Sequence, residues 1–290
     1  MSDLPQGESV IECDAVGRVL YDENGNGLTI PEPGVTVGMA RTTEYPTADD
    51  DFQVSVLSDG TITYPEAIEP RPTGSDSSNI LAGSEGPTGT DRGCSQKSAA
   101  WYTSKQGDPY EWWVGDGAQP GALTQAQAHS AFADIMDNIT GSTNSCGLSD
   151  QVSAAQTYMG YTTTEADINS SGECTARDGT STWDAGNLDS GTVAETCWWA
   201  SGGDMKEADV RFNTTDYDFT TSPSSSTKCG KYDIESVGTH EAGHAFGLAH
   251  ATGPDASYTN WLTMHPVTYE CRTFARSLGY GDVMGLRALY

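Results

Sequence analysis

The sequence predicts an α+β protein built in two parts, a short strand-rich segment and a larger mixed domain. Residues 1–70 alternate apolar and polar side chains between the turn motifs NGNG, PEPG and SDG, a pattern typical of short antiparallel strands. Residues 93–290 mix strand-like runs with three stretches of helical periodicity. Because these stretches do not alternate regularly with strands, an α+β arrangement is favoured over a parallel α/β fold.

A change of composition separates the two parts. Residues 71–92 are rich in Pro, Gly, Ser and Thr, and such a stretch buries too little apolar surface to offset the entropy lost on ordering. The sequence therefore predicts a small β-sandwich over residues 1–70, a linker over 71–92 and a second domain over 93–290.

Local patterns predict the elements of the second domain. Strands are expected over 110–117, 191–199 and 207–213, where apolar and β-branched residues gather. A helix is expected to begin at Thr124, because Thr124 and Gln127 can form a capping box. Its apolar residues recur at helical spacing: Phe132, Ile135, Met136 and Ile139. Two more helices are expected over 233–250 and 281–290.

The charge balance excludes several partners. The chain holds 14 Lys+Arg against 41 Asp+Glu, a formal net charge of −27. Nucleic acid and anionic membranes both require a positive surface, so neither is an expected partner. Copies of so acidic a chain repel one another, which predicts a soluble monomer. No run approaches the roughly 20 apolar residues of a membrane span.

The cysteines indicate the cellular compartment. Seven are scattered along the chain without a CxxC pair, which favours disulfides, and hence a secreted protein, over a thiolate metal cluster. The odd count leaves one thiol unpaired. The first residues show neither the basic nor the apolar region of a signal peptide, so an intracellular protein with free thiols is the alternative.

The stretch HEAGHAFGLAH carries the chemistry. His240 and His244 are four residues apart and would lie on one face of a helix, where they can share a zinc ion. Glu241 is placed to reach a water on that metal. Gly247 can take a positive φ and end the helix, so that the chain turns back and offers His250 as a third ligand. Three protein ligands leave the fourth position of a zinc ion to water, as in catalytic sites.

Chance is the competing explanation for these residues. An HExxH motif alone is a weak signal, but the five positions together should coincide in only roughly one chain in 10⁵ at ordinary residue frequencies. The sequence therefore predicts one catalytic zinc ion.

HEAGHAFGLAH also resembles the zinc signature HExxHxxGxxH of the metzincin metallopeptidases, which carry a methionine turn further along the chain. LTMHP supplies such a turn at Met264. The M-x-P form, the closing helix and the segments GTVAETCWW and EADVRFN are most similar to the matrixins, the matrix metalloproteinase group. The resemblance covers about residues 95–290. It implies a twisted, mostly parallel sheet with an antiparallel edge strand, an active-site helix, the methionine turn and a C-terminal helix.

The resemblance also implies an activity. The chain would be a zinc metalloendopeptidase acting on protein or peptide substrates, with Glu241 as general base. The substrate would lie extended along the edge strand, and 266–269 would form one wall of the pocket for the side chain after the cut. The residues that this implies for substrate binding are Val193, Ala194, Glu195, Pro266 and Tyr269. A secreted or cell-surface adhesion protein with a zinc domain that only binds is the alternative.

The sequence departs from the matrixin pattern in several places. Glu195 and Arg211 stand where matrixins carry histidines for a second, structural zinc. His265 follows the methionine and is interpreted as a turn residue, and His129 as a structural residue of its helix. Asp282 is expected to support the methionine turn by hydrogen bonding.

Two cysteine hypotheses concern the same domain. Cys229 and Cys271 flank the active-site segment and are expected to pair. Cys94 is expected in a disulfide, and the alternative is a thiolate switch on the zinc such as matrixin zymogens use, although the full switch motif is absent.

A calcium loop is considered near the N-terminus. DENGNG resembles the start of such a loop, and residues 16–37 resemble the B-type repeats of bacterial surface proteins, which bind calcium there. The oxygen ligands would come from Asp22, Asn24, Asn26 and Glu32. An Asn-Gly hairpin turn, which needs no ion, explains the same residues, and the two interpretations stay open.

Overall fold

The computed structural model describes residues 4–45, 51–68, 92–94, 96–224, 229–251 and 262–290. The α-helices are α1 (Gln125–Thr140), α2 (Ile234–Ala245) and α4 (Tyr280–Leu289), and short 3₁₀ helices are η1 (Arg92–Cys94), η2 (Pro120–Ala122) and η3 (Phe274–Arg276). All three predicted helices are therefore present. None of the helices in the described part is long and apolar enough to span a membrane. The predicted linker over 71–92 lies almost entirely outside the described residues.

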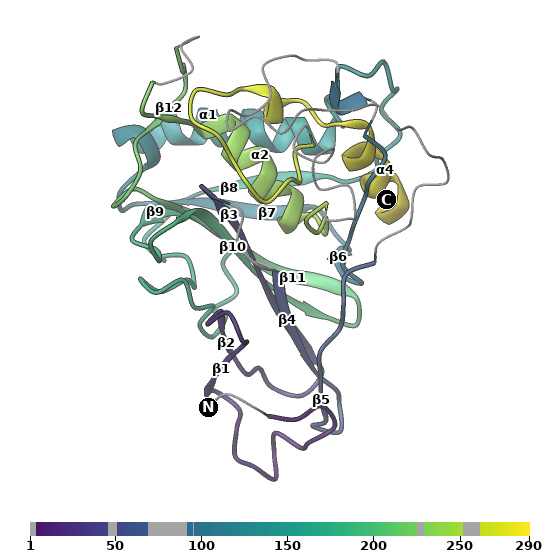
Figure 1. Cartoon of the computed structure of the whole chain (residues 1–290). Helices are drawn as coiled ribbons and strands as arrows, with labels where there is room; N and C mark the ends of the chain where they lie inside the picture. Colours follow the sequence, from purple (N-terminus) through teal and green to yellow (C-terminus); the bar gives the residue numbers. More distant parts are fainter. Residues whose placement is uncertain (1–3, 46–50, 69–91, 95, 225–228, 252–261) are drawn as a thin grey trace.

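Most strands belong to one large sheet (Figure 1). The N-terminal part contributes β1 (Val19–Tyr21), β2 (Gly27–Thr29), β3 (Val35–Thr43), β4 (Asp51–Val56) and β5 (Ile62–Thr63). The remaining strands are β6 (Lys105–Gln106), β7 (Tyr110–Gly115), β8 (Gln156–Thr162), β9 (Thr182–Gly186), β10 (Thr192–Ser201), β11 (Asp204–Asn213), β12 (Phe219–Thr220) and β13 (Tyr232–Asp233). Strands β7, β10 and β11 are the three that the sequence predicts.

The order of the large sheet is β5-β4-β3-β10-β11-β9-β7-β8, with β6 beside β11. The pairs β11–β9, β9–β7, β7–β8 and β11–β6 are parallel, and β10 is antiparallel to β11. This mixed sheet with three helices is the α+β fold expected of a metzincin-like domain. However, β10 does not lie at an edge, because β3 pairs with its outer side in antiparallel register.

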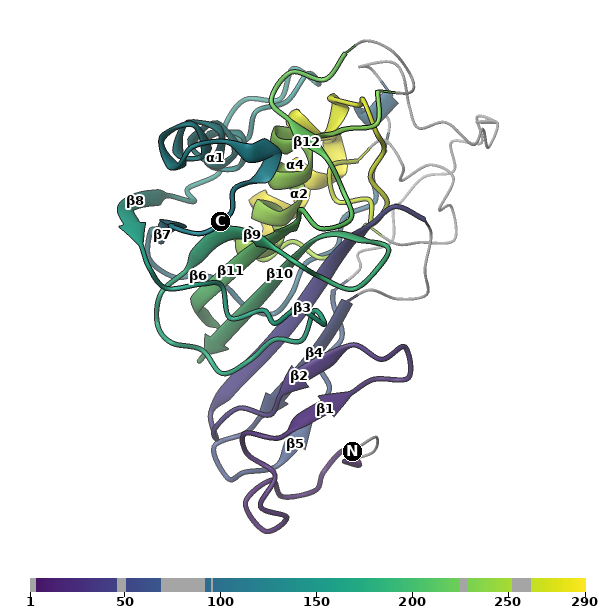
Figure 2. The ribbon, with the colours of Figure 1, turned by 90° about the vertical axis from the view of Figure 1, so that its left-hand side faces the viewer.

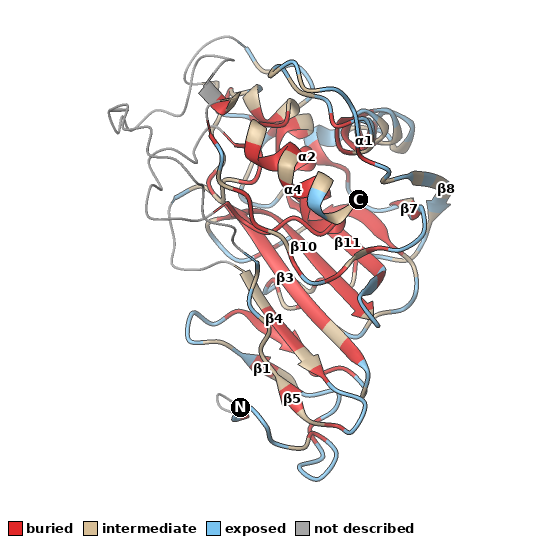
Figure 3. Ribbon diagram, turned by 90° about the vertical axis from the view of Figure 1, so that its right-hand side faces the viewer, coloured by how far each residue is buried: buried red, intermediate tan, exposed pale blue. Residues whose placement is uncertain are grey.

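Two hydrophobic cores lie on opposite faces of the sheet. The helices gather over one face (Figure 2), where Phe132 and Ile135 of α1 and Val237 of α2 pack with alternate residues of β10 and β11. The other face carries a second core that includes Cys197 and Trp199 of β10. Strands β3, β10 and β11 are buried along most of their length (Figure 3). The alternation of side chains along β10 thus supplies both cores.

The N-terminal strands do not stand apart from the large sheet. In the described residues β1 and β2 make a separate hairpin, while β3, β4 and β5 continue the large sheet. Val37 and Met39 of β3 share the second core with Cys197 and Trp199. Alternation marks β3 as a strand but does not specify its partner, which is set by the apolar face left open on β10. The division of the chain into separate domains stays a prediction.

Candidate metal centre

Helix α2 presents the first two histidines. It begins after Asp233, whose carboxylate accepts a hydrogen bond from the backbone of Ser236 and so caps the helix. The helix ends at Ala245, and Gly247 has the predicted positive φ, +98°. A Cβ at Gly247 would lie 2.7 Å from the carbonyl oxygen of Ser104. Only glycine therefore fits this turn, which brings His250 back beside the helix.

Three imidazole nitrogens converge at this point. Nε2 of His240 lies 3.0 Å from Nε2 of His244 and 3.1 Å from Nε2 of His250. All three side chains are buried. The three residues that the sequence singles out as zinc ligands are thus brought together, as a group able to hold one metal ion.

The other ring nitrogens fix the tautomers. Nδ1 of His240 lies 2.6 Å from the carbonyl oxygen of Thr263, and Nδ1 of His244 lies 2.9 Å from that of Leu248. These carbonyl oxygens can only accept a hydrogen bond. In both rings Nδ1 therefore carries the hydrogen and Nε2 is unprotonated.

The Nε2 lone pairs of His240 and His244 then face each other and Nε2 of His250, an arrangement that suits a cation. Burial and the neighbouring histidines lower the pKa of His240 and of His244 well below the usual value, so both rings are neutral. Neutral imidazole nitrogens are the ligands that zinc prefers, at about 2.0–2.1 Å. The residues present therefore fit a zinc ion.

The third ligand is oriented from the N-terminal part of the chain. Oδ1 of Asp51, at the start of β4, lies 2.8 Å from Nδ1 of His250, and its Oδ2 accepts a hydrogen bond of 3.1 Å from the His250 backbone. Burial would raise the pKa of Asp51, but its contacts with His250 lower it below the usual value. A carboxylate behind a ligating histidine sets the ring orientation and raises its basicity. No pattern in the sequence indicated Asp51.

The carboxylate of Glu241 is fully buried beside the histidines. Its Oε1 accepts a hydrogen bond of 2.6 Å from the hydroxyl of Thr42, and its Oε2 one of 2.5 Å from that of Thr196. Burial raises the pKa of Glu241 to about 7, although both hydroxyls act in the opposite direction. A carboxylate with such a pKa can take up and release a proton near neutral pH. The sequence indicated Glu241 but neither threonine.

The methionine turn packs against helix α2. A Cβ built on Gly243 of α2 would lie only 2.2 Å from the sulfur of Met264, so the thioether is packed directly against the helix. Asp282 of α4 accepts hydrogen bonds from the backbone of Thr263 (2.8 Å) and Met264 (3.3 Å). The expectation that Asp282 supports this turn is confirmed.

Three of the five residues expected to bind substrate lie in β10. Val193, Ala194 and Glu195 are buried in β10, where Ala194 is opposite Thr42 and Glu195 opposite Arg41. Arg41 and Glu195 form an ion pair of 2.9 Å. Glu195 therefore stands in a buried ion pair rather than in the second zinc site of matrixins. Arg211 likewise forms a buried ion pair with Asp184.

The remaining histidines lie outside the cluster. His129 stacks on Tyr158 with ring centroids 3.9 Å apart, which agrees with a structural role. Nδ1 of His265 lies 3.1 Å from the carbonyl oxygen of Val267 within the turn. Burial lowers the pKa of His265 to about 4, so the ring is neutral at physiological pH.

Three disulfides join six of the cysteines. The pairs are Cys94–Cys146, Cys174–Cys197 and Cys229–Cys271. The predicted pairing of Cys229 with Cys271 is confirmed, and so is a disulfide at Cys94, which leaves no thiolate there for a zinc switch. Cys13 is the unpaired cysteine expected from the odd count.

The proposed calcium ligands do not gather around an empty space. Oδ1 of Asp22 accepts from the backbone of Asn24 and Asn26, and its Oδ2 accepts from the Asn26 side chain. The carbonyl of the Asn26 side chain accepts from Arg41, and Glu32 pairs with Arg177. These contacts build a turn between β1 and β2, as the hairpin interpretation expects. A calcium ion there has no support.

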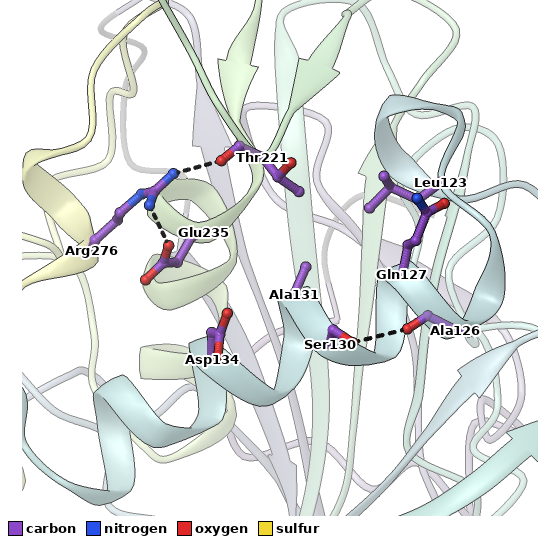
Figure 4. Close-up of a pocket in the computed structure, with 9 residues that line it drawn as sticks. All are labelled: Leu123, Ala126, Gln127, Ser130, Ala131, Asp134, Thr221, Glu235 and Arg276. Atoms are coloured by element: carbon purple, nitrogen blue, oxygen red, sulfur yellow. Dashed lines mark hydrogen bonds and ion pairs between the residues drawn. The ribbon is translucent and has the colours of Figure 1, made fainter.

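A cavity beside α2 is separate from the histidines. It measures about 430 Å³ and lies between α1, the start of α2 and η3 (Figure 4). Arg276 crosses it to bond Glu235 at 2.7 Å and the carbonyl of Thr221 at 3.0 Å. No residue of the metal cluster lines this cavity.

The fold and the histidine cluster agree with the catalytic domain of a metzincin. A sequence model of the matrixin family matches residues 154–290, which supports a matrixin-like metzincin catalytic domain in this part of the chain. A search among curated proteins finds no match. Matrixins are zinc-dependent endopeptidases, which implies zinc as cofactor and protein as substrate. They typically act outside the cell, in keeping with three disulfides.

Proposed function

We propose that this protein is a secreted zinc endopeptidase in which His240, His244 and His250 hold the metal and Glu241 is the general base. The observation that carries the proposal is the convergence of three histidine Nε2 atoms beside a buried carboxylate whose pKa is raised to about 7. Such an acid lies close to the operating pH, where proton transfer by a side chain is most effective.

Peptide hydrolysis would use both the metal ion and side chains of the protein. When bound by the three histidines, a zinc ion would lower the pKa of a water molecule and polarise the scissile carbonyl. The carboxylate of Glu241 accepts the proton of the attacking water and returns it to the leaving amine. The hydroxyl of Thr196, 2.5 Å from Oε2, keeps the carboxylate in position.

Other groups prepare the site before a substrate arrives. The carbonyl oxygens of Thr263 and Leu248 and the carboxylate of Asp51 hold the three rings in one tautomer. The backbone of β10, which pairs with β3 in this structure, would give an extended peptide a partner strand once β3 is displaced. The carbonyl of Pro266 and the backbone N–H of Thr268 line the opposite wall, and both form strand-like hydrogen bonds.

Hydrolysis of a quenched peptide library by the zinc-loaded protein tests the proposal. The variant with an opened cleft described below, Thr43→Pro, should cut peptides faster than wild type, a zinc chelator should stop it, and adding Glu241→Gln should lower the rate at least about 100-fold while one zinc stays bound. Equal rates in Thr43→Pro with and without Glu241→Gln would overturn the role of Glu241. Bound zinc without hydrolysis, even after the cleft is opened as described below, would favour a domain that only binds.

A further inference from the structure

Strand β3 lies where a peptide substrate is expected. It pairs with β10 in antiparallel register from Thr36 to Thr43. Its end continues in parallel beside the opposite wall, because the backbone N–H of Thr43 donates to Pro266 (2.9 Å) and the carbonyl of Thr43 accepts from Thr268 (3.0 Å). The backbone N–H of Glu44 also donates to Gly191 at 3.1 Å. Both walls of the expected cleft are thus hydrogen-bonded to one internal strand.

A side chain of the same strand fills the space beside the histidines. Thr42 lines a cavity together with His240, Val267 and Thr268, and only about 10 Å³ of it remains open. This is close to the minimum of roughly 10–15 Å³ that a single water needs. Val267 and Thr268 belong to the wall expected for the side chain after the cut. Thr42 therefore stands at that position, with its hydroxyl on Glu241.

Buried contacts anchor β3 in this place. The guanidinium of Arg41 bonds the carboxylate of Glu195 (2.9 Å), the side-chain carbonyl of Asn26 (2.9 Å) and the carbonyl of Gly172 (2.6 Å). Val37 and Met39 are buried in the core beneath β10. Strand β3 can therefore leave this place only if the contacts of Arg41, Val37 and Met39 are lost together.

We propose that β3 is an internal ligand of the substrate cleft, which binds between β10 and residues 266–268 in place of an extended peptide. Thr42 occupies the pocket for the residue after the cut, and the peptide bond between Arg41 and Thr42 lies next to Glu241. The cleft is closed to other chains while β3 is paired. The inference rests on the proposed function for the identity of the cleft. The evidence that β3 fills the cleft is its pairing with β10 and with residues 266–268.

Hydrogen–deuterium exchange of the full chain tests the occupancy without any enzyme assay. If β3 fills the cleft in solution, the amide hydrogens of Thr43, Glu44 and Thr268 are bonded and should exchange at least about 100-fold more slowly than unprotected amides. Exchange of these three amides at the unprotected rate, in a chain whose β10 and β11 stay protected, would overturn the inference.

A proline variant opens the cleft at one end. Thr43→Pro removes the N–H that donates to Pro266 and leaves the anchors of β3 intact. Thr63→Pro, the same change in the outer strand β5, is the matched control. The probe is a fluorescent peptide with the sequence of residues 36–45, TVGMARTTEY, added to zinc-loaded protein in which Glu241→Gln prevents cutting.

The expected result is binding of the peptide to Thr43→Pro at least about tenfold tighter than to wild type or to Thr63→Pro. Equally tight binding to wild type and Thr43→Pro would show that the cleft is open, and the inference would fall. Binding to neither protein, with the Thr268 amide still protected from exchange, would show that β3 still fills the cleft. The proposed function is judged separately, by hydrolysis with Glu241 present. Protected amides and an opened variant that binds peptide but never cuts it would sustain this inference and remove the proposed function.

Discussion

The hydroxyl of Thr42 donates a hydrogen bond of 2.6 Å to Oε1 of Glu241, across 199 residues of sequence. A second contact of the same span joins the backbone of His250 to Asp51. Both Thr42 and Asp51 belong to the N-terminal strands, and both touch residues of the predicted metal site. The N-terminal part of the chain therefore takes part in the geometry of the centre, and several consequences can be measured.

Asp51→Asn should weaken zinc binding by about 10–100-fold, the usual effect of losing a carboxylate behind a ligating histidine. Asparagine keeps an acceptor for Nδ1 of His250 but loses the charge that raises the basicity of the ring. Competition with a chromogenic chelator measures the affinity. Glu23→Gln, which removes a charge from an exposed residue of the same segment, should bind zinc as wild type does. An unchanged affinity in Asp51→Asn would contradict the assigned role.

Gly243→Ala should destabilise the fold by about 1–3 kcal/mol, as overpacking of a core does. The added methyl group would come within 2.2 Å of the sulfur of Met264, which must move away from beneath the histidines. Urea unfolding measures the change. Gly117→Ala is the control, because a Cβ there meets nothing within 4 Å. Equal stability of the two variants would mean that Met264 does not support the helix.

Asp167→Asn should stabilise the protein at pH 8 and have less effect at pH 5. Asp167 lies beside Glu207 and Asp209. Burial, and after it the hydrogen bond and charge of Asp167, raise the pKa of Glu207 to about 7. The folded chain then holds a proton that the unfolded chain releases near pH 4.5, so this group makes stability fall as the pH rises from about 4.5 to 7.

Removing the carboxylate of Asp167 should reduce the stability that is lost as the pH rises. Thermal unfolding at pH 5 and pH 8 measures it, with an expected gain of about 2–4 °C at pH 8. Asp116→Asn, an exposed aspartate before α1, controls for the loss of one charge from an acidic chain. A gain of the same size at both pH values would argue against repulsion within the cluster.

One thiol per chain should react with a chromogenic disulfide reagent under denaturing, non-reducing conditions. Six of the cysteines are joined in three disulfides, and Cys13 is exposed and unpaired. Cys13→Ser should remove the signal, and reduction of wild type should raise it to seven thiols. Seven reactive thiols without reduction would instead indicate an intracellular protein, the alternative to secretion.

The sequence predicted the parts of the site that depend on local spacing. His240 and His244 are one helical turn apart, and the positive φ of Gly247 could be expected from the need to bring back His250. The resemblance to matrixins indicated Asp282, and the positions of Cys229 and Cys271 on either side of the active-site segment suggested their pairing. For His240, His244 and Gly247, regular backbone geometry links the residues over a short distance, so a pattern of residue types suffices.

The sequence could not predict contacts that depend on strand pairing. The alternation in residues 35–43 indicates a strand, but the same pattern would suit a separate sandwich or the outer side of β10. Thr42 and Asp51 acquire their roles only through this pairing. Threonine and aspartate are common surface residues, and Asp51 ends a run of three aspartates, so neither stands out before the partner strand is known.

Zinc-edge X-ray absorption of the loaded full chain is the sharpest test of the metal centre. We expect one zinc per chain with three nitrogen neighbours at about 2.0–2.1 Å and one oxygen from water. His244→Ala should lose this signal, and His129→Ala should keep it. A sulfur neighbour at about 2.3 Å, or a fourth protein nitrogen that closes the shell, would contradict a catalytic zinc centre at His240, His244 and His250.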